Sequence, residues 1–133
     1  MITVIPPVPS RIDQYFWEAA RESRLVARRC KNCGALQHPP TPMCPHCQSL
    51  DFTVDDLSGR GVISSWIVSR HPSVPESDSR IVALIDLEEG IRMVSNIAAE
   101  PGTPIRTGMP VKVTFAQFGD VTLPQFVIDE QVA

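Results

Sequence analysis

Short apolar runs dominate the second half of the chain and predict a series of β-strands. Val111, Val113 and Phe115 alternate with polar neighbours, which is the pattern of a strand with one buried face. Apolar stretches of strand length also occur at 62–68, 81–87, 91–97 and 121–128. Turn-forming residues separate these runs, and no helical pattern lies between them. Five short strands of this kind predict a small sandwich or a partly open barrel, and a five-stranded oligonucleotide/oligosaccharide-binding (OB) barrel fits the size best.

The N-terminal part has a helical period instead. Ile12, Tyr15, Phe16 and Ala19 recur at helical spacing. Ser10, followed three residues later by an acidic residue, suits a helix start, so we predict a helix from Ser10 to about residue 24. Residues 1–9 contain three prolines and predict an extended arm. Residues 25–27 predict a short strand that leads into a cysteine-rich segment.

That segment contains all four cysteines as two Cys-x-x-Cys pairs, Cys30/Cys33 and Cys44/Cys47, with ten residues between the pairs. Two such knuckles supply four thiolates around one Zn²⁺ ion, and in a reducing compartment this spacing favours metal ligation over disulfides. Four sulfur ligands close the coordination sphere, so the predicted zinc is structural. Gly34 suits the backbone turn after the first knuckle, whereas Gln48 stands where glycine is more comfortable.

Three units follow from these patterns: an arm and helix at 1–28, a zinc ribbon at 29–51 and an OB barrel at 52–133. Zinc ligation leaves no cysteine as a nucleophile, and the sequence has no nucleophile-elbow, P-loop or dinucleotide-binding motif. We therefore assign no catalytic residue. Asp55-Asp56 is interpreted as a loop after a strand, His38 and His46 are expected to be solvated loop residues, and His71 alone does not indicate catalysis.

Charge is distributed unevenly along the chain. Residues 1–49 carry six basic and three acidic side chains (+3), and residues 50–133 carry six basic and twelve acidic ones (−6), which gives the net charge of −3. Four thiolates and one Zn²⁺ would take the total to about −5. Arg21, Arg24, Arg28, Arg29 and Lys31 are clustered. Two interpretations stay open: phosphate contacts, with RNA or a nucleotide-bearing cofactor such as coenzyme A, or a solvated helix end whose cations favour the thiolates.

Consecutive aromatic residues on the predicted helix indicate a contact surface. Tyr15, Phe16 and Trp17 cannot all face one core, because successive helical residues lie ~100° apart. At least one of them is expected to be exposed or packed on a partner. The N-terminus lacks the pattern of a signal peptide and no apolar run reaches the ~20 residues of a membrane span, so we expect a cytoplasmic protein without a membrane partner.

Taken in order, these features resemble a known family. The resemblance rests on the following motifs: Phe16-Trp17-Glu18, the two knuckles with Pro39-Pro40 between them, Ser58-Gly59-Arg60-Gly61, residues 81–90, Ser95-Asn96-Ile97, residues 108–111 and Leu123-Pro124. Together they resemble the acyl-CoA-associated OB-fold family with a rubredoxin-like zinc ribbon, long catalogued as domain of unknown function thirty-five. The resemblance covers about residues 11–128. Three residues depart from the family pattern. Thr41 stands where an arginine is often found, and Ala19 and Ser23 stand where glycines are common.

The resemblance implies an accessory subunit whose catalytic residues lie on a partner. That partner would be a thiolase-superfamily protein, such as a sterol-carrier-protein-type thiolase or aldolase, acting on acyl-CoA thioesters that include steroid side-chain esters. This chain would help to form or shield the CoA or substrate channel. Phe16, Trp17, His71 and Pro72 are our candidates for partner or ligand contacts.

Two alternatives belong to other classes. Zinc ribbons and OB folds also bind nucleic acid, although the acidic barrel segment makes this partner the less favoured one. A free-standing acyl-CoA carrier is the other alternative, and measurable affinity of the isolated chain for a CoA ester would favour it.

Overall fold

The computed structural model describes residues 7–70, 72–73, 75, 79–100 and 102–130 and is mainly β. One short helix, α1 (Gln14–Arg21), precedes the strands of the described chain. The strands are β1 (Val26–Cys30), β2 (Leu36–Gln37), β3 (Phe52–Asp56), β4 (Arg60–Ser69), β5 (Arg80–Leu87), β6 (Arg92–Ile97), β7 (Pro110–Phe118) and β8 (Val121–Ile128).

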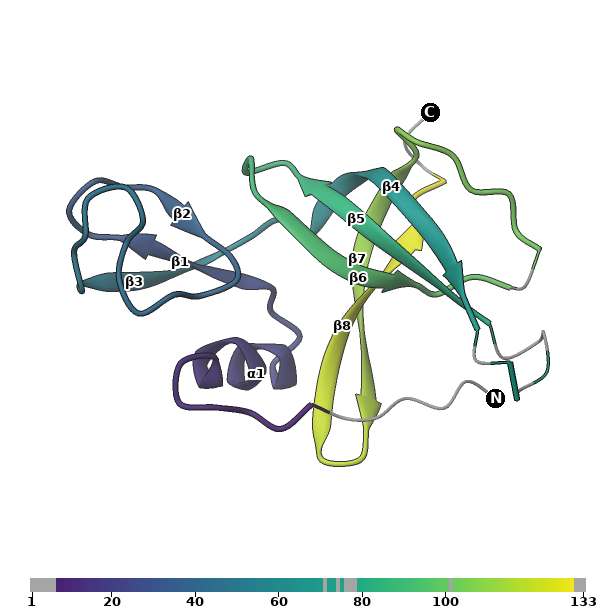
Figure 1. Ribbon diagram of the computed structural model, residues 1–133, viewed down its shortest axis with the longest axis horizontal. Helices are drawn as coiled ribbons and strands as arrows, with labels where there is room; N and C mark the ends of the chain where they lie inside the picture. The colour runs from purple at the N-terminus through teal and green to yellow at the C-terminus, as the bar shows by residue number, and fades with distance from the viewer. Residues whose placement is uncertain (1–6, 71, 74, 76–78, 101, 131–133) are drawn as a thin grey trace.

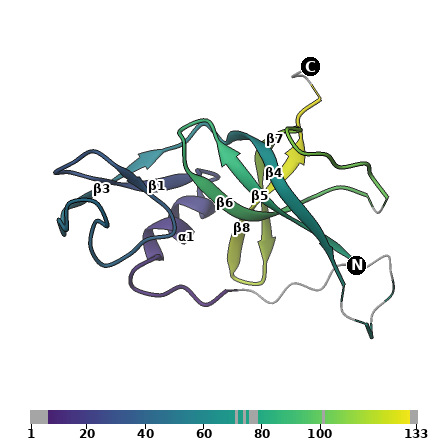
Figure 2. The same ribbon diagram turned by 45° about the horizontal axis from the view of Figure 1, so that its top comes forward.

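The strands form two sheets (Figure 1). A three-stranded sheet has the order β2-β1-β3 and contains the cysteine segment, and β4-β5-β6-β8-β7 form a closed barrel. The predicted fold class, a helix followed by a zinc ribbon and a five-stranded OB barrel, is confirmed. Figure 2 shows the ribbon sheet and the barrel side by side, with α1 beneath the ribbon sheet and beside β8.

Alternation along the barrel strands produces the core. On β5, Ala83, Ile85 and Leu87 are buried and the residues between them are partly exposed, because successive side chains of a strand point to opposite faces. Phe126 on β8 has no exposed surface. Phe16 from α1 belongs to the same buried cluster, so helix and barrel share one core.

Pairing between β1 and β3 defines the ribbon sheet. The two strands are antiparallel along their whole lengths, from Val26 opposite Asp56 to Cys30 opposite Phe52. Residues 52–56, which the sequence patterns placed at the start of the barrel unit, therefore pair inside the ribbon sheet. The interpretation of Asp55-Asp56 as a loop was wrong: both lie in β3, where a strand forms because β1 offers a full set of hydrogen-bonding partners.

The helix is shorter than predicted at both ends. Its N-cap is Asp13, whose Oδ1 accepts hydrogen bonds from the Ser10 backbone N–H at 2.7 Å and from the Ser10 hydroxyl at 2.9 Å. The C-terminal turn closes at Ser23, which has a left-handed φ of +59°. The Ser23 and Arg24 N–H groups donate back to the carbonyls of Ala20 and Ala19, the hydrogen bonds of a Schellman motif. Ser23 thus occupies a position that favours glycine.

Entry into the barrel requires a glycine at position 59. Gly59 has a φ of +82°, and a Cβ added there would lie 2.4 Å from Cγ1 of Val113 on β7. Gly90, in the β5–β6 turn, has a similar φ of +91°, but nothing lies within 4 Å of an added Cβ. An added Cβ would therefore meet backbone strain alone at Gly90, and both backbone strain and steric overlap at Gly59.

We expect Gly59→Ala to lower the free energy of unfolding by more than about 2 kcal/mol, because backbone strain and overpacking add. Gly90→Ala is the matched control and should lower it by only about 1 kcal/mol. Urea unfolding of both variants measures the difference. Equal losses would show that the approach of Val113 does not constrain this turn.

Candidate functional site

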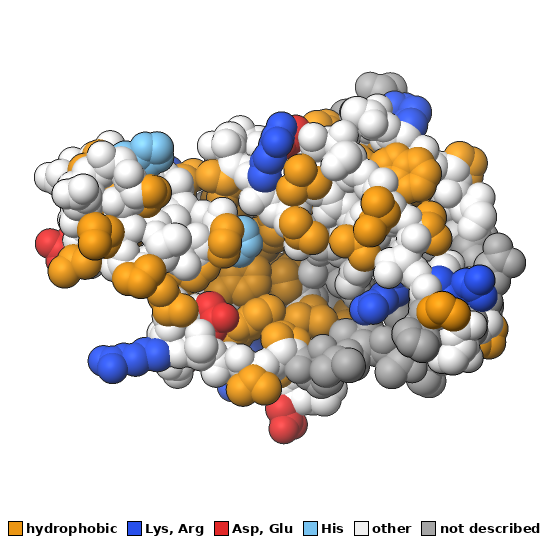
Figure 3. All heavy atoms as spheres, viewed as in Figure 1, with side chains coloured by type: hydrophobic (Ala, Val, Ile, Leu, Met, Phe, Trp, Pro, Cys, Tyr) orange, Lys and Arg blue, Asp and Glu red, His pale blue; other side chains and the backbone are white. Residues whose placement is uncertain are grey.

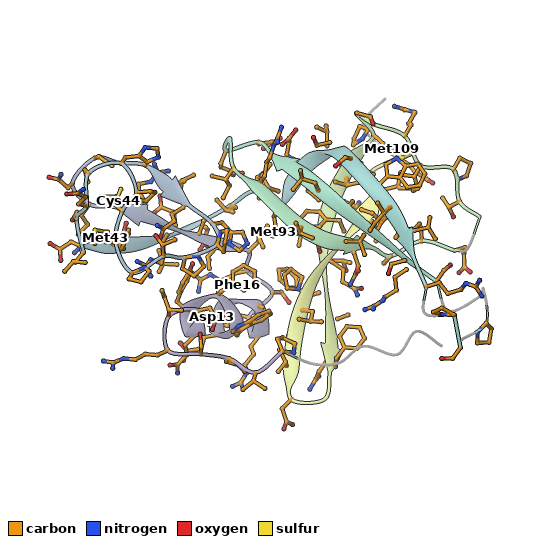
Figure 4. All side chains as sticks on the ribbon, in the orientation of Figure 1. Asp13, Phe16, Met43, Cys44, Met93 and Met109 are labelled. Atoms are coloured by element: carbon orange, nitrogen blue, oxygen red, sulfur yellow. The ribbon has the colours of Figure 1, made fainter. Side chains whose placement is uncertain are left out.

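The four cysteine sulfurs lie together at the end of the ribbon sheet. All of them are within 4.8 Å of one another, with 3.5 Å between the sulfurs of Cys30 and Cys47 and 3.6 Å between those of Cys33 and Cys44. Tetrahedral coordination with Zn–S bonds of about 2.3 Å places ligand sulfurs about 3.8 Å apart. The arrangement therefore suits one zinc ion, as predicted. Cys44 is labelled in Figure 4, within the ribbon and distant from the barrel.

Each knuckle is a tight turn with the same backbone pattern. The Gly34 N–H donates to the Cys30 carbonyl at 2.9 Å, and the Gln48 N–H donates to the Cys44 carbonyl at 2.8 Å. Both following residues have positive φ, +80° for Gly34 and +66° for Gln48. The prediction that glycine would be more comfortable at position 48 is confirmed by this conformation.

Backbone N–H groups of the knuckles stabilise the thiolate form of the buried cysteines. Hydrogen bonds from the N–H groups of Cys33 and Asn32 lower the pKa of Cys30 to about 6, and a hydrogen bond from the Cys47 N–H lowers the pKa of Cys44. At Cys33 the Ala35 N–H also lowers the pKa, but the neighbouring sulfurs raise it to about 12. Four thiolates at this spacing therefore need a cation between them.

The chemistry available to this centre is structural. Four sulfur ligands leave no open coordination position for water or substrate, and metal binding of this kind supplies on the order of 10 kcal/mol to folding. His46 is exposed and His38 lies outside the group of sulfurs, so neither adds a ligand.

The clustered cations beside the centre contact the chain itself. Arg24 forms an ion pair with Asp56 at 2.7 Å, and Arg29 forms one with Asp55 at 2.5 Å. The Arg28 guanidinium lies 3.7 Å from the centroid of the Phe52 ring and donates to the Thr41 carbonyl. Three of the five clustered cations therefore hold β1 against β3 and the knuckle loop. These contacts disfavour phosphate binding, and they also differ from a solvated helix end, because Arg28 and Arg29 lie in β1.

A groove lies where helix, ribbon and barrel meet, and we call it the junction groove. Its volume is about 330 Å³, and its walls include Phe16 and Trp17 of α1, His38 and Pro39 of the ribbon, Met93 and Val94 of β6 and Pro124 of β8. Figure 3 shows this face hollowed between the three parts, with hydrophobic side chains in the hollow. Phe16 and Met93 face the same space in Figure 4.

His38 belongs to this groove, and the expectation that it is solvated was wrong. Its ring lies 5.3 Å from the Phe16 ring, and burial lowers its pKa, so it is neutral at pH 7. Its Nδ1 is buried without a hydrogen-bond partner. The Trp17 indole N–H interacts with the Asp13 carboxylate, which also lines the groove. The groove thus combines mainly apolar walls with one buried polar atom, Nδ1 of His38, that has no partner in the described chain.

The predicted contact residues separate in space. Phe16 is buried and Trp17 partly buried, and both line the junction groove. Pro72 is exposed on the β4–β5 connection, and His71 lies outside the described residues. The barrel residues of the groove were not predicted, because their strand pattern marks only alternation and not which segment packs against them.

A zinc ribbon followed by a closed OB barrel defines the class of this protein, and comparison with known families agrees. Residues 17–53 match the rubredoxin-like zinc ribbon domain of ChsH2, and residues 55–116 match its C-terminal OB-fold domain. Among solved structures, a chain of the "Ltp2-ChsH2(DUF35) aldolase" is 38% identical, has a TM-score of 0.84, and is matched over 98% of its length by 92% of this chain. The chain belongs to this family, as its motifs indicated.

Curated relatives have names from acyl-CoA chemistry. A probable enoyl-CoA hydratase alpha subunit of Thermomonospora curvata is 39% identical over 90% of this chain, and the 3-oxo-4,17-pregnadiene-20-carboxyl-CoA hydratase alpha subunit of Mycobacterium tuberculosis is 33% identical over 93%. The chain spans only 38% and 40% of these two proteins. A benzoylsuccinyl-CoA thiolase subunit, BbsA of Thauera aromatica, is 31% identical over 62% of the chain and 58% of its own length.

Within the described ranges, no helix combines the length and the apolar character needed to cross a bilayer.

We expect purified protein to contain about one zinc ion per chain, as four thiolates at this spacing require. Cys44→Ser should lose the metal and unfold the ribbon, because Cys44 is buried and supplies one of the four sulfurs. Elemental analysis and circular dichroism with a chelator measure both effects. His46→Asn, a change of the exposed histidine inside the same knuckle, should retain the zinc. Full metal content in Cys44→Ser would contradict the assignment.

Gln48→Gly should raise the free energy of unfolding of the zinc-loaded protein by about 1 kcal/mol, because it removes the cost of a left-handed conformation at a residue with a side chain. Gly34→Gln makes the reverse change in the first knuckle and should lower that free energy by a similar amount. Thermal unfolding at constant zinc concentration measures both variants. Shifts of the same sign would show that the two knuckles are not equivalent.

Proposed function

We propose that this chain is a non-catalytic accessory subunit of a thiolase-superfamily enzyme, a sterol-carrier-protein-type thiolase or an aldolase, that acts on acyl-CoA thioesters. Steroid side-chain CoA esters are the substrate class that we favour. The zinc held by Cys30, Cys33, Cys44 and Cys47 keeps the ribbon folded, and the catalytic residues belong to the partner.

The observation that carries the proposal is the match to the aldolase chain, which extends over nearly the whole of both chains at 38% identity. The thiolase subunit among the relatives supports the same class of partner. This chain spans only about two-fifths of the two relatives named as hydratase subunits. Their names therefore support acyl-CoA chemistry, but they do not assign hydration to this chain. The chain's own composition agrees, because all four of its cysteines gather at one centre and none is left for acyl transfer.

The junction groove is our candidate for the part of the CoA or substrate channel that this subunit contributes. Its apolar walls suit an acyl or pantetheine segment, and the unpartnered Nδ1 of His38 suits an amide or carbonyl group of such a ligand. Phe16 and Trp17 would act there as walls, as the sequence suggested. Pro72 and His71 stay candidates for contact with the partner.

Val94 offers a way to test the groove without unfolding the protein. Its side chain lines the groove and is 68% exposed, so a polar replacement leaves the core intact. Leu50 on the ribbon is 71% exposed and lies outside the groove, and it provides a matched position.

We expect the chain to co-purify with a thiolase-superfamily protein of its host when the two are co-expressed, and to raise the activity of that protein on acyl-CoA. Val94→Asp should lower the activity of the complex at least about tenfold, because it places a charge in the apolar channel wall. Leu50→Asp should leave the activity within about twofold, as expected for an isolated surface change.

Failure of the two proteins to co-purify, together with full activity of the enzyme alone, would contradict the accessory role. Equal effects of the two aspartate variants would contradict only the assignment of the groove.

A further inference from the structure

A second and larger pocket lies at one end of the barrel, separate from the zinc centre. Its volume is about 600 Å³, within the range of small-molecule sites. It lies where β4 ends and β5 begins, beneath the connection from β6 to β7. Apolar side chains from five segments form most of its wall: Trp66, Ile81, Ile97, Ile105 and Phe118. We call it the barrel-end pocket.

Trp66 shows how open this pocket is. Its side chain is 39% exposed, although its strand partner Ala83 is buried. Val68, the next residue of the same face, is 58% exposed and also lines the pocket. Two large apolar side chains thus face a hollow that the described chain leaves uncovered.

Five residues with polar side chains line the same pocket, and three of them carry a guanidinium or an amide. Arg80 is half-buried at the start of β5 and forms no ion pair or side-chain hydrogen bond with a described residue. Asn96 on β6 and Gln125 on β8 are also half-buried, and their side-chain amides have no hydrogen-bond partner in the described ranges. By contrast, Arg60 and Arg92 elsewhere on the barrel each pair with a carboxylate.

We infer that the barrel-end pocket binds an unesterified carboxylic acid with an aliphatic or alicyclic body. The guanidinium of Arg80 would pair with the carboxylate, the amides of Asn96 and Gln125 would donate the remaining hydrogen bonds, and the apolar wall would bury the body. This site adds to the accessory role and does not depend on it.

Charge and number of donors favour this ligand over the other anions of acyl metabolism. A single guanidinium beside two neutral amides matches one carboxylate, which accepts two parallel hydrogen bonds from arginine. A coenzyme A head group carries several phosphate charges and a nucleoside, which need more cations and polar contacts than this wall contains. An amine would meet the charge of Arg80 with the same sign.

The full chain with Trp17→Phe tests the proposal, since Trp66 is then its only tryptophan. Octanoate, 1-octanol, octylamine and octanoyl-CoA are titrated separately below their aggregation concentrations, and Trp66 emission is followed. Octanoate should produce a saturable blue shift and bind at least about tenfold more tightly than octanol, which corresponds to one charge-assisted contact. The chain is used alone, so the result is independent of any partner enzyme.

Arg80→Gln in the same background should lower octanoate affinity at least about tenfold and leave octanol binding within about twofold. Arg80→Lys keeps the charge but loses the planar fork, so its octanoate affinity should lie between those of the parent protein and Arg80→Gln. This variant also controls for a folding defect. Arg92→Gln neutralises an arginine at the other end of β6 and should leave octanoate binding unchanged. Thermal unfolding confirms that each variant is folded.

Three results would overturn the inference. Equal affinities for octanoate and octanol would show that the pocket does not recognise a carboxylate. Tighter, Arg80-dependent binding of octanoyl-CoA would assign the pocket to the thioester. A Trp66 emission that does not saturate with octanoate would show adsorption to the surface only.

Discussion

Burial of Phe16 is the contact on which the arrangement of the three parts depends. The ring reaches from α1 into the barrel core, packs edge-on against Trp17 at 5.0 Å, and has His38 of the ribbon within 5.3 Å. One side chain therefore touches helix, ribbon and barrel. Full burial of a phenylalanine side chain contributes about 1.5–3 kcal/mol, a large share of the net stability of a small domain. The junction groove exists because this anchor fixes the angle between ribbon and barrel.

Two electrostatic features stabilise the ribbon. At the metal centre, four sulfurs concentrate negative charge that a bound Zn²⁺ offsets. Along β1, Arg29 beside Cys30 pairs with Asp55, and Arg24 just before the strand pairs with Asp56, although these partners lie more than 25 residues away in the sequence. These pairs are largely exposed, so each contributes only about 0–1 kcal/mol and acts mainly on the register of β1 against β3. Two of the clustered positive charges in the first third of the chain are thus paired with carboxylates of the same chain.

Features encoded over a few residues were predictable from the sequence, and features made by distant segments were not. Apolar runs and, at 111–115, alternation predicted all five barrel strands, and the interval 121–128 coincides with β8. The cysteine spacing predicted the metal centre, and the position of Gln48 predicted its unusual backbone. The extension of β3 through Asp55 and Asp56 was missed because two consecutive aspartates are typical of a loop, and they lie in a strand here through their pairing with β1. The junction groove was missed because α1, the 38–40 segment, β6 and β8 meet only in three dimensions, and the same meeting buries His38.

The barrel is closed by an unequal set of strand pairs. β7 and β8 pair antiparallel over eight positions, whereas β6 and β8 are parallel and meet at one register pair, Ile97 opposite Phe126, supported by a hydrogen bond from the Ala98 N–H to the Phe126 carbonyl at 2.8 Å. The free energy of local opening rises with the number of contacts that the opening breaks. We therefore expect this seam to be the part of the barrel that opens at the lowest free energy. Asn96 and Gln125 flank the seam, and the junction groove and the barrel-end pocket share Asn96. A ligand in either hollow would therefore lie beside this same seam, because Asn96 belongs to both walls.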